Sequence, residues 1–154
     1  MASKGSKFAL VLSLLCFLAV GIVWGEGPAD VRALNGILDA FETAYIDEDV
    51  DMLDGILSEN YVMVAGGRDD PRNARVMGKK QLLSGIEHMF SQVEYRTHRH
   101  TDRAFEFHGA VAELNSVLTS EMAGGTKNVQ NSYHICAREN GEWKVVFTSF
   151  LMAE

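Results

Sequence analysis

The chain has 154 residues, which is enough for one domain of ordinary size. Hydrophobic residues make up 47% of it, a globular composition that excludes an intrinsically disordered chain. The formal net charge of −7 opposes contact with phosphate backbones, and no basic stripe interleaved with aromatic residues is present, so we expect no nucleic-acid partner.

Residues 1–25 have the pattern of an export signal. Two lysines precede an uncharged apolar run from Phe8 to Val23, and Gly25 is a suitable cleavage position. This pattern predicts a secreted or periplasmic protein whose mature domain spans residues 26–154, without membrane association after cleavage. The apolar run is slightly short for a membrane span of ~20 residues. An uncleaved N-terminal anchor is the competing interpretation.

Three helices are predicted in the first half of the mature chain. The first spans Asp30 to Ile46, where apolar residues recur at helical spacing, and Asp30 is a suitable residue to cap its start. The second helix begins at Asp49 and the third at Gly78. Between them, a short strand at 61–64 and a polar surface loop at 68–75 are expected.

From residue 93 onward the hydrophobic period changes to two. Three or four antiparallel strands are predicted, at about 93–108, 110–121, 128–138 and 143–152. The strongest turn signal is Asn140-Gly141, because both residues tolerate the positive φ of a type I′ hairpin. Helices followed by a meander indicate an α+β domain, in which a curved antiparallel sheet wraps around the three helices and leaves a cavity at one end.

Four motifs follow one another along this chain. They are Asp47-Glu48-Asp49-Val50-Asp51 with Leu57-Ser58-Glu59-Asn60-Tyr61-Val62, Met77-Gly78-Lys79-Lys80-Gln81-Leu82, Phe107-His108-Gly109-Ala110-Val111-Ala112 and Gly141-Glu142-Trp143-Lys144-Val145-Val146. Together they resemble the SnoaL-like and ketosteroid isomerase-related domains of the nuclear transport factor 2-like superfamily, over about residues 30–151. The resemblance implies a cone-like fold. It implies no single function, because the superfamily includes isomerases, dehydratases, cyclases, hydrolases, oligomerisation modules and non-enzymes.

Two positions depart from the catalytic pattern of that superfamily. Ketosteroid isomerase-like members place a carboxylate at the end of the first strand, where this chain has Val64 and Ala65. Many relatives carry a histidine after the tryptophan of the last strand, where this chain has Ser149. An inherited proton-transfer mechanism is therefore not expected.

The densest polar cluster is His98, His100 and Asp102, which share one face of a regular strand because alternate residues point the same way. Two imidazoles and a carboxylate suit acid–base chemistry, and they are also a workable ligand set for a metal. Unbroken alternation places them opposite Phe105 and Phe107, which predicts a solvated face. A β-bulge within the strand would reverse that assignment. We expect neither a metal nor a cofactor.

Three further residues are candidates for lining the cavity: Tyr45, Tyr61 and His134. Packing roles are the alternative for each, since Tyr45 completes the first helix's apolar stripe and a buried histidine often only satisfies a structural partner. The single cysteine of the mature chain, Cys136, is interpreted as inert packing.

Three functions remain open. The first is an exported domain that binds a small organic molecule through Tyr45, Tyr61 and His134. The second is an isomerase or lyase whose general base is His98, His100 or His134 and whose tyrosine hydroxyl stabilises a developing oxyanion. The third is a homodimerisation module that associates through the outer face of its sheet.

Overall fold

The computed structural model describes residues 27–66 and 74–152, so the predicted export signal and most of the loop predicted at 68–75 lie outside the described residues. The described part is an α+β domain with three helices and a six-stranded sheet. The elements are α2 (Pro28–Asp47), α3 (Val50–Ile56), β1 (Leu57–Ala65), β2 (Arg75–Gly78), α4 (Lys79–Phe90), β3 (Tyr95–His108), β4 (Val111–Met122), β5 (Lys127–Glu139) and β6 (Glu142–Met152).

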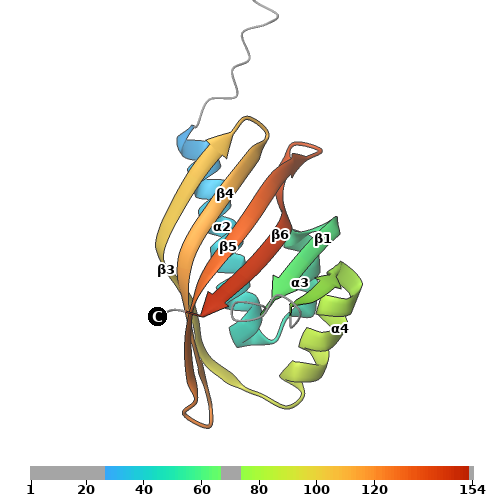
Figure 1. Cartoon of the computed structure of the whole chain (residues 1–154), viewed down its shortest axis with the longest axis vertical. Coiled ribbons are helices and arrows are strands. Elements are labelled where there is room, and N and C mark those ends of the chain that lie inside the picture. Colours follow the sequence, from blue (N-terminus) through green and yellow to red (C-terminus); the bar gives the residue numbers. More distant parts are fainter. Residues whose placement is uncertain (1–26, 67–73, 153–154) are drawn as a thin grey trace, which may run out of the picture.

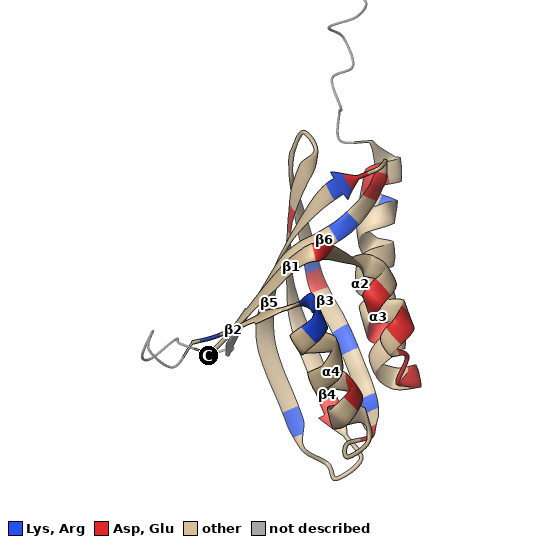
Figure 2. Cartoon of the chain, turned by 90° about the vertical axis from the view of Figure 1, so that its right-hand side faces the viewer, with Lys and Arg blue, Asp and Glu red and all other residues tan. Residues whose placement is uncertain are grey.

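The strand order is β2-β1-β6-β5-β4-β3, so the C-terminal meander forms one continuous sheet and β6 lies beside β1 (Figure 1). The β1–β6 pair is parallel and the other pairs are antiparallel. The sheet is curved, and the helices cover one of its faces (Figure 2). The predicted α+β architecture, a curved sheet around three helices, is confirmed.

The predicted hairpin between the last two strands is also confirmed. Asn140 has a φ of 53° and Gly141 a φ of 88°, so both occupy the left-handed region that a type I′ turn requires. The turn pairs Glu139 with Glu142 and thereby sets the register of β5 against β6.

The start of α2 differs from the prediction. Its N-cap is Gly27, Pro28 occupies the first turn, and no side chain caps the helix. The carboxylate of Asp30 accepts hydrogen bonds from Nε1 of Trp143, at 3.0 Å, and from the guanidinium of Arg138. Asp30 therefore joins the helix to β5 and β6 instead of capping it.

The first strand is longer than predicted, and the short strand β2 was not predicted. Arg75 was assigned to a loop, yet Arg75–Gly78 pairs with the end of β1, with Met77 opposite Met63. Four mostly exposed residues carry no hydrophobic alternation, so this strand is specified by its partner and not by its own sequence.

The core lies between the helices and the covered face of the sheet. Leucines of α2 and α3 pack there against inward residues of the meander, and Leu34, Leu38, Leu53, Leu114 and Val145 have no exposed surface. Cys136 is also fully buried and unbridged, and burial raises the pKa of its thiol to about 12. A thiol in that state is unreactive, as expected of a packing residue.

None of the helices in the described ranges has the length and apolar character needed to span a bilayer.

Candidate functional site

A β-bulge in β3 determines where the histidine cluster points. The pairing of β3 with β4 shifts register between Thr101 and Ala104, and Asp102 has a φ of 51°. Because the bulge resets the alternation, His98 and His100 share the inner face with Phe105 and Phe107. The two histidines are 7% and 4% exposed, so the solvated face predicted for them is wrong. The exposed Asp102 does not join them.

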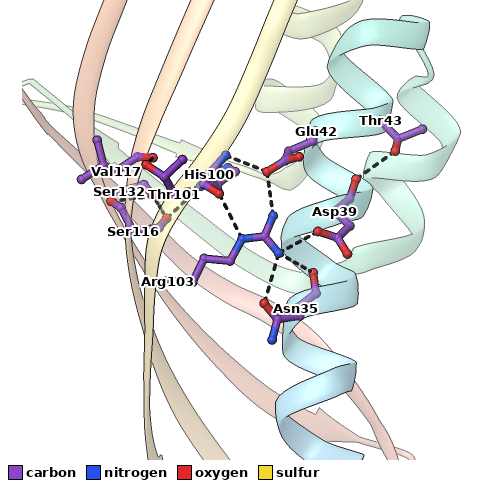
Figure 3. A network of polar contacts seen from close by, with 10 residues as sticks. All are labelled: Asn35, Asp39, Glu42, Thr43, His100, Thr101, Arg103, Ser116, Val117 and Ser132. Atoms are coloured by element: carbon purple, nitrogen blue, oxygen red, sulfur yellow. Dashed lines mark hydrogen bonds and ion pairs between the residues drawn. The ribbon is translucent and has the colours of Figure 1, made fainter.

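An arginine clamp holds the bulge against α2 (Figure 3). The guanidinium of Arg103 bonds to the carboxylates of Asp39 and Glu42, each at 2.6 Å, and Nε of Arg103 donates to the carbonyl of His100 at 3.1 Å. The backbone N–H of His100 donates to Glu42 at 2.7 Å. Since β3 is an edge strand, this clamp supplies the partners that a neighbouring strand would otherwise give to His100.

Each inward histidine is held by hydroxyl groups of neighbouring strands. Nδ1 of His98 contacts Ser120 at 3.0 Å, and Nδ1 of His134 contacts Thr148 at 2.9 Å. Nδ1 of His100 lies 2.8 Å from the hydroxyl of Ser116. These contacts fix the ring orientations, because one nitrogen of each imidazole is occupied at the sheet surface.

The three histidine rings lie together. The ring centroids of His98 and His100 are 5.9 Å apart, and those of His100 and His134 are 5.7 Å apart. Helix α2 supplies the opposite side: Phe41 stacks on His134 at 5.4 Å, and Tyr45 stacks on His98 at 3.9 Å with nearly parallel planes.

These side chains line a mostly apolar cavity between the helices and the sheet. The lining residues are Phe41, Tyr45, Leu53, Leu57, Tyr61, Met63, Leu82, Ile86, His98, His100, Leu118, His134, Thr148 and Phe150. The cavity holds about 20 Å³, which is room for roughly one water molecule. None of its lining side chains is an aspartate, glutamate, lysine or arginine.

Burial keeps all three histidines neutral at physiological pH. It lowers the pKa of His98 and of His134 to about 3, with a further contribution from the nearby His100. Burial, assisted by the positive charge of Arg103, lowers the pKa of His100 to about 4. An imidazolium in this cavity would lose hydration without gaining an anionic partner.

The two tyrosines are firmly protonated. Burial raises the pKa of Tyr45 above its usual range. Burial also raises the pKa of Tyr61 to about 12, an effect that a hydrogen bond with Thr148 partly offsets. Thr148 therefore links the phenol of Tyr61 to the imidazole of His134 in one hydrogen-bonded chain.

His134 leaves one polar atom unsatisfied. Its Nε2 is fully buried and has no hydrogen-bond partner among the described residues. Such a group costs about 1–3 kcal/mol compared with a satisfied one. His134 belongs to the lining of the cavity, so a molecule inside the cavity is a suitable partner for this nitrogen.

The described residues contain no group of three histidine, cysteine, aspartate or glutamate side chains arranged to hold a metal ion.

Comparison with solved structures identifies the fold. A nuclear transport factor 2-like protein from Cytophaga hutchinsonii superposes with a TM-score of 0.68 at 13% identity, over 82% of this chain and 99% of that one. This chain has the nuclear transport factor 2-like fold. A protein of that type and of unknown function from Pseudomonas putida gives a TM-score of 0.69 at 11% identity, over 82% and 89% of the two chains. A protein of unknown function with a cystatin-like fold, from Nostoc punctiforme, gives 0.68 at 15% identity, over 82% and 93%.

Searches with the sequence find no matching protein-family model and no matching curated protein. At these low identities the likeness establishes the nuclear transport factor 2-like fold alone.

In this nuclear transport factor 2-like domain, the five predicted site residues meet at one cavity: Tyr45, Tyr61, His98, His100 and His134. The hydroxyl partners were missed by sequence reasoning. A signal for them exists in β4, where Ser116 and Ser120 alternate at period two with buried Leu114 and Leu118. Small polar residues on the apolar face of a strand indicate buried hydrogen-bond partners.

Proposed function

We propose that this domain is exported and binds a small organic molecule, with an uncharged part of the ligand inside the histidine cavity. The observation that carries the proposal is Nε2 of His134, which is buried in a mostly apolar lining and has no hydrogen-bond partner among the described residues. Ligand pockets combine apolar walls with a few polar groups that fix orientation. A ligand atom bonded to Nε2 would remove the cost of leaving that nitrogen unsatisfied.

The ligand's polar atom can be either a donor or an acceptor. If Nδ1 of His134 carries the proton and donates to Thr148, Nε2 is an acceptor; in the other tautomer, Nε2 donates. The hydroxyl of Thr148 can accept from His134 or donate to it, because its other hydrogen-bond partner is the phenol of Tyr61, which can also donate or accept. A phenol, an alcohol or a ring N–H is therefore as suitable as a carbonyl.

Binding must enlarge the cavity, because about 20 Å³ accommodates a water molecule but not an organic ring. Met63 is the lining residue best able to make room, since its unbranched side chain has several rotatable bonds. Ligand entry therefore requires the lining of the closed cavity to move.

The hydrogen-bonded chain Tyr61–Thr148–His134 also favours a second function, an isomerase or lyase with His134 as base and Tyr61 as oxyanion donor. A neutral imidazole can accept a proton, and a protonated phenol can donate to an oxyanion. However, a base whose pKa is about 3 is far weaker than one tuned near the operating pH. Binding is therefore the better supported function.

Titration with phenol and indole tests the proposal. We expect the methyl NMR signal of Met63 and the ring signals of His134 to shift saturably with either probe. His134→Phe keeps an aromatic ring but removes the nitrogen, and should weaken phenol binding by about five- to tenfold, the worth of one hydrogen bond. His108→Phe, at an exposed histidine, is the matched control. Unshifted Met63 signals at saturating probe, or unchanged affinity in His134→Phe, would refute the proposal.

A further inference from the structure

An open groove lies on the seam between the end of α2 and the start of β3. Its volume is about 360 Å³, within the range of small-molecule sites. The lining residues are Glu42, Thr43, Ile46, Asp47, Arg96, Thr97, His98 and Arg99.

His98 is the one residue that lines both this groove and the buried cavity. On the cavity side the ring stacks on Tyr45 at 3.9 Å, and its Nδ1 is held by Ser120. His98 therefore lies at the boundary between the solvent-open groove and the three-histidine cavity.

The groove also carries charge that the cavity lacks. Arg96 and Arg99 are exposed and flank His98 along the strand, and neither has a carboxylate within ion-pair distance among the described residues. Of the two acidic lining residues, Glu42 is already bonded to Arg103 and to the backbone of His100, which leaves Asp47 as the counteracting charge.

We propose that this groove is the outer half of the binding site and holds the carboxylate of a one-ring organic acid, whose uncharged ring lies past His98 in the cavity. The inference rests on the function proposed above, since it requires the cavity to accept a ring. The two linings suit different parts of such a ligand. The inner lining has no Asp, Glu, Lys or Arg side chain, and the outer one offers two guanidinium groups that form no ion pair with a described residue. Arginine binds carboxylates well because its donors form a planar fork.

Two matched probes test the inference: 3-phenylpropionate and its uncharged analogue 3-phenylpropionamide. Calorimetry at pH 7 and low ionic strength should show tighter binding of the acid, with the preference decreasing as salt is added. Arg96→Gln and Arg99→Gln should each weaken binding of the acid by about two- to fivefold, the range for exposed ion pairs, and leave binding of the amide unchanged. Arg32→Gln, an exposed arginine near the other end of α2, controls for the loss of one positive charge.

The position of the ligand is tested by chemical modification of the five histidines with diethyl pyrocarbonate, followed by mass spectrometry. Saturating 3-phenylpropionate should slow modification of His98, and should leave the rates at exposed His88 and His108 unchanged. His98 that reacts at the same rate with and without bound acid would overturn the assignment of the groove.

The outcomes separate the two proposals. If neither probe binds at millimolar concentration, the cavity does not accept a ring, and both proposals fail. If both probes bind equally and the Arg96 and Arg99 variants have no effect, the cavity proposal stands and the groove inference fails. In that case the two arginines serve to protect the exposed edge of β3 against pairing with another chain.

Discussion

Lowering the pH should destabilise this domain through its buried histidines. His98, His100 and His134 have folded-state pKa values of about 3, 4 and 3, below the value of about 6.5 for an unfolded histidine. Between pH about 4 and pH about 6.5 the unfolded chain therefore binds more protons than the folded chain. Stability is fully present above pH about 6.5 and is lost progressively as the pH falls toward about 4.

The magnitude is large for a single domain. In this window each histidine lowers the free energy of unfolding by about 1.4 kcal/mol for each pH unit of acidification. Between pH 7 and pH 5 the loss is about 2 kcal/mol per histidine. Three such groups together cost about 5–6 kcal/mol. That loss is comparable with the whole stability of many domains, about 5–15 kcal/mol.

Urea denaturation at several pH values, monitored by the fluorescence of Trp143 and by circular dichroism, measures this loss. His134→Phe should reduce the pH dependence by about one third, because it removes one of the three histidines whose pKa is lowered by folding. The variant His88→Gln/His108→Gln changes exposed histidines and should leave the dependence intact. A free energy of unfolding that stays constant between pH 7 and pH 5 would refute the burial argument.

Three further predictions concern the fold. Arg103→Met should lower the free energy of unfolding in urea by about 1–3 kcal/mol, because the carboxylate of Glu42 is only 25% exposed and loses its charge partner. An unchanged urea midpoint would show that the clamp contributes nothing to stability. Gly141→Ala should lower stability in thermal unfolding by about 1 kcal/mol, because Gly141 has a φ of 88° that alanine adopts only with strain. Gly124→Ala is the control and should be nearly neutral, because Gly124 lacks a positive φ and, as at Gly141, no neighbouring atom obstructs a Cβ. Phe147 lies on the outer face of β6, because its neighbour Thr148 points into the cavity, and its ring contacts Tyr133. If this face forms a homodimer, native mass spectrometry should show a dimer for the parent protein and a monomer for Phe147→Glu. A monomeric parent protein would contradict the dimer.

Much of the fold could be predicted because its signals are local. The apolar stripe of α2, the period-two strands and the Asn140-Gly141 turn each depend on residues close in sequence. β2 could not be predicted, because its pairing with β1 is a tertiary contact of four mostly exposed residues.

The prediction that the histidine cluster faces solvent was wrong for a single local reason. Regular alternation requires an uninterrupted strand, and one left-handed residue at Asp102 shifts every side chain beyond it. Aspartate is among the residues that tolerate this conformation, but its presence does not demand it. Glu42 of α2 stabilises the bulge through Arg103 and the backbone of His100, and no pattern within β3 records that contact.

The parallel contact between β1 and β6 has a consequence for synthesis. It joins Ala65 to Phe150, so the first strand finds its neighbour only after β2, α4, β3, β4 and β5 have been made. Contacts so distant in sequence slow folding, because the intervening loop must close before the contact stabilises anything. A nascent chain therefore lacks its β1–β6 pair until β6 has left the ribosome, and the sheet that covers the core is incomplete up to that point.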